Sequence, residues 1–271
     1  MKCLVLGILC IAPFSLIFHC SAIDLFTVYD ARSYSMGNVQ SVLPGFTNPA
    51  SFGFTSASRY FSLQYINRYG IKELSTWSGA INFPNKYLNT GFFISRYGMK
   101  AFHETFSGLN MYRRLSDRIS LGIRISYLNI HYSDKEPNKS AFSADIGLLV
   151  SVLEQLKLSV LVINPFCLRM KIGNTKEKLP SVIFVGACYE LLQSLMLTGE
   201  IEKNFVLPVS CKLGFEYIPI KELSVRAGFF TSPLTPTFGV GVRLLPFTID
   251  LAFSKYSVLG FQSSCSLKFN F

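Results

Sequence analysis

From about Arg59 to its end, the chain alternates apolar and polar residues. The apolar phase of the last ten residues consists of Cys265, Leu267, Phe269 and Phe271, and the opposite phase is polar. Because successive side chains of a strand point to opposite faces, this period of two predicts an amphipathic β-strand with one dry and one wet face. The same alternation recurs in segments such as 119–127. The chain is therefore predicted to be all-β.

Applied along the chain, this pattern predicts about 14 strands. The predicted strands are 59–67, 74–83, 88–97, 104–113, 119–130, 141–152, 156–163, 181–191, 194–202, 209–218, 223–230, 237–244, 247–256 and 262–271.

The lengths of the connections supply an independent argument. Bacterial outer-membrane barrels have an even number of strands, short periplasmic turns and longer external loops. If the first strand runs outward, the periplasmic connections are all short: 84–87, 115–118, 154–155, 193, 219–222 and 245–246. The two longest connections, 131–140 and 164–180, both fall on the external side. A soluble β-sandwich, the main alternative fold, would not require this, so the sequence predicts a transmembrane antiparallel β-barrel.

Composition agrees with a barrel. The chain is 49% hydrophobic, yet after its N-terminus it holds no apolar run long enough for a helical span. Its net charge of +10 is spread over strands and loops rather than clustered. We therefore expect contact with anionic lipids of the outer membrane rather than with nucleic acid.

Charges of both signs occupy the phase of the alternation expected to face the lumen. They are Arg124, Asp145, Lys157, Glu200, Glu202, Lys212, Glu216, Arg226, Arg243, Asp250 and Lys268. Glu216 and Arg226 lie across one predicted hairpin, and Arg243, Asp250 and Lys268 alternate in sign on three consecutive strands. Two interpretations stay open: a ladder of ion pairs that satisfies inward charges, or a surface for binding or conduction.

The N-terminus predicts a cleaved signal peptide over residues 1–22, since Lys2 precedes an apolar run and small residues end at Ala22. A retained anchor and a lipoprotein site at Cys20 are the alternatives. The mature chain would then divide into a plug-like segment, 23–58, and a barrel, 59–271. Its four remaining cysteines, Cys167, Cys188, Cys211 and Cys265, show no metal-ligand spacing, and their disulfide state is left open.

The segment before the barrel does not alternate and carries a recognisable set of short motifs. Their residues are Ala31, Arg32, Met36, Gly37, Asn48, Pro49 and Ala50. This set resembles the N-terminal signature of FadL-like outer-membrane proteins, which include fatty-acid transporters and the PorV and PorQ proteins of type IX secretion. The chain departs from that signature at Asn38 and Ser51, where the family has glycine, and it lacks the acidic pair before Asn48.

The resemblance implies a 14-stranded barrel with an inward-folded N-terminal plug or hatch. It implies either passage or binding of small apolar molecules or an accessory role in type IX secretion, with secretion-system proteins as partners. For the accessory role, the external connection 164–180 is the expected contact surface. The aromatic end of the chain, Phe269 and Phe271, looks like the insertion signal read by the barrel-assembly machinery, and this resemblance implies a location in a Gram-negative outer membrane.

No motif for a cofactor, a metal or a known catalytic fold is present, so we expect no cofactor and no enzyme activity. One polar set, Asn129, His131 and Ser133, is compatible with the Ser–His–Asn arrangement of outer-membrane phospholipases, in which histidine activates serine. A lipid hydrolase and a purely structural barrel are therefore the alternative functions.

Overall fold

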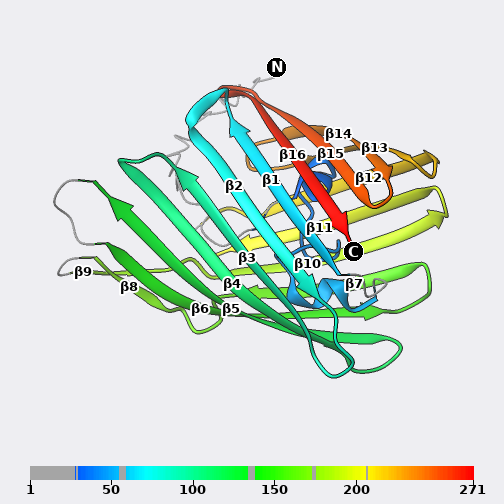
Figure 1. The fold of residues 1–271 in the computed structure, drawn as a ribbon, viewed down its shortest axis with the longest axis horizontal. Coiled ribbons are helices and arrows are strands. Elements are labelled where there is room, and N and C mark those ends of the chain that lie inside the picture. The colour runs from blue at the N-terminus through cyan, green and yellow to red at the C-terminus, as the bar shows by residue number, and fades with distance from the viewer. Residues whose placement is uncertain (1–27, 29, 55–58, 134–137, 173–174, 206) are drawn as a thin grey trace, which may run out of the picture.

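The computed structural model describes residues 28, 30–54, 59–133, 138–205 without 173–174, and 207–271; for 169–178 it describes only the backbone. Fourteen antiparallel strands close into a barrel (Figure 1). They are β1 (Tyr60–Arg68), β2 (Ile71–Phe83), β3 (Asn89–Gly98), β4 (Phe102–Arg114), β5 (Ile119–Tyr132), β6 (Lys139–Ser151), β7 (Leu156–Ile163), β10 (Val182–Leu192), β11 (Leu195–Asn204), β12 (Ser210–Ile220), β13 (Leu223–Phe230), β14 (Thr235–Leu244), β15 (Phe247–Tyr256) and β16 (Gly260–Asn270).

All 14 strands predicted from the alternation are confirmed, with ends that differ by at most a few residues. The last strand pairs with the first from Tyr60 opposite Asn270 to Arg68 opposite Gln262, which leaves no open sheet edge. One element was missed. The connection 164–180, expected to be a plain loop, contains a short hairpin of β8 (Arg169–Ile172) and β9 (Thr175–Lys178) outside the barrel sheet.

The two faces of the barrel wall differ as the alternation predicts. On β5, Ile119, Leu121, Ile123 and Ile125 are exposed on the outside, whereas Arg124 and its inward neighbours are buried. The same apolar outer phase continues around the barrel to Leu267 of β16. An apolar outer face around a polar interior is the pattern of a barrel that spans a membrane. None of the helices in the described parts of the chain is long and apolar enough to cross a membrane.

The segment before β1 folds inside this wall. It contains a one-turn helix, α1 (Ala31–Ser35), and a 3₁₀ helix, η1 (Pro49–Phe54), both largely buried. The carboxylate of Asp30 accepts hydrogen bonds from the Ser33 amide and hydroxyl, which caps α1. Figure 1 shows these blue elements enclosed by the barrel. The predicted plug is therefore present, and we use "plug" for residues 30–54.

Inward-facing glycines make room for the plug. They are Gly122 of β5, Gly147 of β6, Gly186 of β10, Gly214 of β12, Gly228 of β13 and Gly239 of β14. A methyl group added at Gly122 would lie 2.6 Å from the Ala50 nitrogen, closer than real contacts allow. We call these six residues the glycine girdle. At these six strands the plug backbone fits directly against the wall.

Candidate functional site

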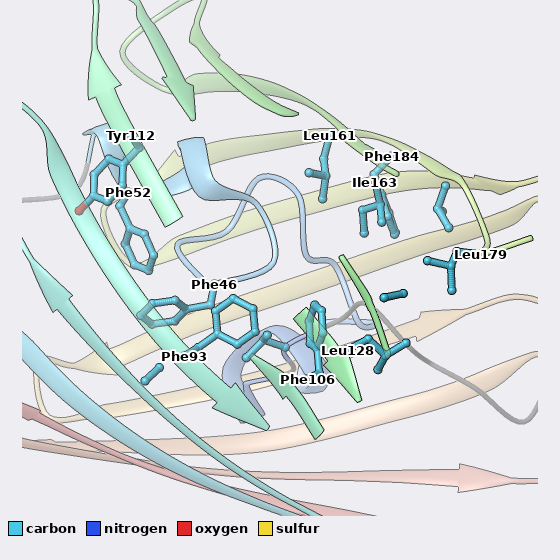
Figure 2. Packing of buried hydrophobic residues seen from close by; sticks show 14 of the residues in the cluster. Phe46, Phe52, Phe93, Phe106, Tyr112, Leu128, Leu161, Ile163, Leu179 and Phe184 are labelled. Atoms are coloured by element: carbon cyan, nitrogen blue, oxygen red, sulfur yellow. The ribbon is translucent and has the colours of Figure 1, made fainter. Parts of the chain in front are cut away.

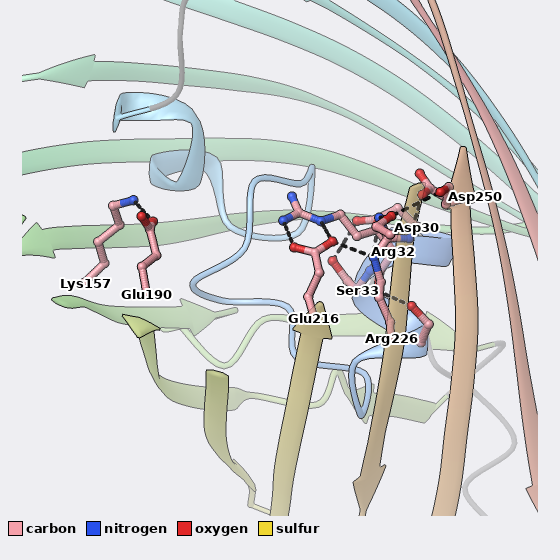
Figure 3. A network of polar contacts seen from close by, with 11 residues as sticks. Asp30, Arg32, Ser33, Lys157, Glu190, Glu216, Arg226 and Asp250 are labelled. Atoms are coloured by element: carbon pink, nitrogen blue, oxygen red, sulfur yellow. Dashed lines mark hydrogen bonds and ion pairs between the residues drawn. The ribbon is translucent and has the colours of Figure 1, made fainter. Parts of the chain in front are cut away.

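Two wall carboxylates hold the plug. Glu216 of β12 receives the guanidinium of Arg32, from Nε at 3.0 Å and Nη2 at 2.6 Å (Figure 3). Glu200 of β11 accepts the backbone amides of Gln40 at 3.0 Å and Ser41 at 2.6 Å. Charge-assisted hydrogen bonds of this length are stronger than neutral ones. The plug is thus fixed at two separate points of the wall.

A third anchor is the buried ion pair of Arg124 on β5 and Asp145 on β6, joined at 2.6 Å with neither side chain exposed. Arg124 also donates to the carbonyl oxygen of Phe46 in the plug at 3.2 Å. Asp145 accepts the amide of Asn164, where the external connection leaves β7, at 2.9 Å. One ion pair therefore links the plug, the wall and the base of the external hairpin.

The remaining inward charges form a partial ladder. Glu200 and Glu202 both pair with Lys212, and Glu216 pairs with Arg226 across the hairpin that the sequence predicted. Lys157 pairs with Glu190. The expected alternation of Arg243, Asp250 and Lys268 does not produce pairs between them. Asp250 is held instead by Arg226 at 2.6 Å.

In the described part of the chain, Arg243 and Lys268 make no ion pair, and the Lys268 ammonium lies 3.9 Å from the centre of the Tyr60 ring. The reason is register. Thr248 is opposite both residues, while Asp250 is opposite Gly241 and Ser266. The two basic residues are therefore free to face the lumen.

The residues of the N-terminal motifs all lie in the plug. Ala31 and Met36 are fully buried, and Gly37 adopts a positive φ of 69° while its amide donates to Thr237 of β14. The Asn48 side chain bridges the Ser41 carbonyl and the Ala50 amide. Pro49 opens η1. These residues therefore shape and seat the plug, and only Arg32 among them is charged.

Burial changes the acid–base character of two plug groups. It raises the pKa of the Asp30 carboxyl, a rise that the hydrogen bonds from Ser33 oppose. It also raises the pKa of the Tyr34 hydroxyl to about 12, and that hydroxyl lies 2.6 Å from Ser254 of β15. Tyr34 therefore stays neutral at ordinary pH and closes the space between plug and β15.

Part of the lumen wall is apolar, which a simple alternation of apolar and polar residues does not predict. Phe93, Phe106, Leu128, Leu161, Ile163 and Phe184 point inward from β3, β4, β5, β7 and β10 and belong to one buried cluster that includes Phe46 and Phe52 of the plug (Figure 2). The signal was visible in the sequence. On β7, Val160 to Ile163 are apolar in both phases of the strand toward its external end, and on β5 the inward phase turns apolar at Leu128 and Ile130.

A cavity of about 520 Å³ lies between the plug and the wall formed by β1, β2 and β14–β16. Phe46, Phe52 and Tyr60 supply aromatic lining, while Arg243 and Lys268 supply charge. A second, wider hollow of about 1160 Å³ opens among the short turns and shares Arg243 and Leu245 with the first. The cavity beside the plug thus adjoins the end of the barrel where the short turns lie.

The polar residues compatible with a hydrolase, Asn129, His131 and Ser133, are only partly brought together. The His131 ring bonds through Nδ1 to Oδ1 of Asn138 at 2.7 Å rather than to Asn129, and it stacks on His103 with ring centres 4.6 Å apart. Among the described contacts of Ser133, its backbone amide donates a hydrogen bond to the Ala101 carbonyl, and no hydrogen bond joins Ser133 to His131. The geometry therefore does not join a serine nucleophile to a base.

The remaining predicted residues lie on the wall. Phe269 packs on Phe247 with ring centres 5.1 Å apart, and the backbone amide of Phe271, just after β16, donates a hydrogen bond to the Arg59 carbonyl. Their role as an insertion signal stays a prediction. Cys167, Cys188, Cys211 and Cys265 are free thiols.

No protein-family model and no curated protein sequence matches the chain. Solved structures do. The toluene transporter TodX of Pseudomonas putida aligns at a TM-score of 0.68 and 11% identity, over 90% of this chain and 98% of that one. The chain has the FadL-type barrel fold. A Pseudomonas aeruginosa FadL homologue aligns at 0.64 and 11%, over 91% and 99%.

The monoaromatic hydrocarbon channel CymD also matches the FadL-type barrel of this chain, with a TM-score of 0.66 and 9% identity over 89% of this chain and 97% of that one. These likenesses confirm the fold expected from the N-terminal motifs: a transmembrane barrel of 14 strands with an inward plug. At such low sequence identity, these structural similarities establish the fold alone.

Proposed function

We propose that this protein is an outer-membrane channel that passes small, largely apolar molecules. The observation that carries the proposal is the inward cluster of aromatic and aliphatic side chains, which meets the cavity beside the plug at Phe46, Phe52 and Tyr60. Polar barrels that conduct water-soluble ions have no need of an apolar lumen, whereas ligand sites for apolar molecules are lined mainly by such side chains. The hydrocarbon channels that share this fold support the same substrate class.

The route of such a molecule through the barrel depends on whether the plug moves. It is held by Glu216, by Glu200 and by the Arg124–Asp145 pair, and it fits against the glycine girdle. Meanwhile the cavity of about 520 Å³ adjoins the hollow among the short turns without crossing the plug. We therefore propose that ligands move around a fixed plug, between its Phe46 side and β1, β2 and β16.

A disulfide between plug and wall tests this route. The hydroxyls of Ser41 in the plug and Ser159 on β7 lie 2.9 Å apart, on the side of the plug away from the cavity. The double variant Ser41→Cys, Ser159→Cys would be made in a chain whose four mature cysteines are serine. Cells carrying it in the outer membrane would be assayed for uptake of radiolabelled toluene and oleate, oxidised and reduced.

We expect equal uptake in both redox states, above that of cells without the protein. The single variant Ser41→Cys is the matched control for oxidation. Uptake lost on oxidation and restored by reductant would show that the plug must move. No uptake above background in any form would reject passage and favour the accessory role in type IX secretion, for which the external hairpin is the expected contact surface.

A further inference from the structure

The outer face of the wall carries a polar patch where most of its surface is apolar. One register row crosses four strands: Arg96 of β3 is opposite Thr105 of β4, which is opposite Asn129 of β5, which is opposite Ser140 of β6. Each alternates with a buried neighbour, so the row faces outward. We call it, with His103 and His131, the outer polar patch.

The patch lies immediately above an aromatic level of the wall. Tyr127 and Phe142, two residues nearer the middle of β5 and β6, face outward and pack on each other with ring centres 5.0 Å apart. Beside the row, Trp77 is opposite Arg96 and packs on Tyr65 at 4.4 Å. Aromatic rings of this kind mark the boundary between acyl chains and head groups. The outer polar patch therefore sits at the depth of the lipid head groups, at the external end.

Its chemistry suits an anion next to hydroxyl groups. Arg96 is exposed and has no ion pair within the described residues. His103 and His131 stack on the next row outward, and Nδ1 of His131 is engaged by Asn138. Threonine, asparagine and serine fill the remainder of the row with neutral donors and acceptors. An arginine fork is well matched to phosphate, and neutral hydrogen-bonding groups are suited to sugar.

We propose that the outer polar patch binds a phosphorylated glycolipid of the external leaflet, with its phosphate on Arg96 and its sugar along Thr105, Asn129 and Ser140. The stacked histidines would border the phosphate. The inference rests on the outer-membrane location in the proposed function but not on passage of any ligand. Failure of one therefore leaves the other standing.

The single tryptophan of the chain provides the readout, because Trp77 is directly opposite Arg96. Refolded full-length protein in detergent would be titrated with purified lipid A. Phosphatidylglycerol, a lipid that carries a phosphate but no sugar, would be titrated in parallel. Trp77 emission would be followed. The variant Arg96→Gln removes the proposed phosphate contact, and Arg113→Gln is the matched control, an exposed residue on the outer phase of β4 toward its other end.

We expect a saturable change in Trp77 emission with lipid A. Binding should weaken about tenfold in Arg96→Gln, which corresponds to the loss of one charge-assisted contact. It should stay unchanged in Arg113→Gln. Asn129→Ala, which removes no charge, should weaken lipid A alone. The proposal is overturned if both arginine variants bind equally, or if phosphatidylglycerol binds as tightly as lipid A. A heat-shift gel verifies that each variant is folded, and native mass spectrometry of co-purified glycolipid gives a second measurement.

Discussion

At the scale of single residues, the buried pair of Arg124 and Asp145 joins three parts of the molecule. Each side chain is fully buried, and between them they reach Phe46 of the plug and Asn164 beyond β7. Removing one partner of a buried pair leaves the other charge unneutralised in a place that water does not reach.

The change Asp145→Asn keeps the shape and removes the charge. We expect it to lower the free energy of unfolding by about 3–5 kcal/mol, because Arg124 would be buried without a counter-ion. Urea titration of the refolded protein, followed by circular dichroism, measures this. Asp117→Asn is the control, since that carboxylate is fully exposed beside Arg114 and should change nothing measurable. Equal stability of the two variants would mean that the pair contributes no net stabilisation.

Whether a side-chain contact could be predicted from the sequence also differs from residue to residue. Glu216 and Arg226 were expected to face each other and do, because a hairpin fixes its own register. The pairing of Arg226 with Asp250 was not foreseen, since it crosses two strand boundaries and depends on side-chain reach. Arg32 was known only as part of a motif. Its partner, 184 positions away, follows from how the plug is seated, which no local pattern encodes.

At the scale of elements, the strands were predictable and the packing between plug and wall was not. Alternation is a local property, so 14 strands could be placed from it. Gly122 and Gly147 look like ordinary small residues in a strand until the plug backbone is seen against them. The β8–β9 hairpin was missed because its strands have four residues each, too few for an alternation to stand out.

The glycine girdle leads to a prediction about the plug as an element. Gly122→Ala should destabilise the protein, because the new methyl group would lie 2.6 Å from the Ala50 nitrogen. The same change in a chain lacking residues 30–54 should have almost no effect, since nothing would be left to clash. Thermal unfolding of the four proteins gives this double-mutant cycle. Gly79→Ala is the control, because its nearest neighbour is an ordinary 3.8 Å away. Additive effects would show that Gly122 does not act through the plug.

At the scale of the whole molecule, the barrel is defined by its two faces. Ile123 is exposed on the outer face of β5, with Ile146 and Met111 opposite it, well inside the aromatic level. Arginine at this position in a bilayer should cost about 2–4 kcal/mol, the range for a charge facing mid-bilayer hydrocarbon. Unfolding of Ile123→Arg and Ile123→Ala in lipid vesicles separates the charge from the lost side chain. If both changes cost the same, this face does not contact hydrocarbon.

The glycine girdle also constrains the order of assembly. The plug precedes β1 in the chain, yet its hydrogen-bonded contacts lie on strands from β4 to β15. Once β16 has paired with β1, a closed ring of hydrogen-bonded strands surrounds the space that the plug occupies. At the glycine girdle the plug backbone lies so close to the wall that even one added methyl group would clash. We therefore predict that the plug is in place before closure, so that the last strands close around it.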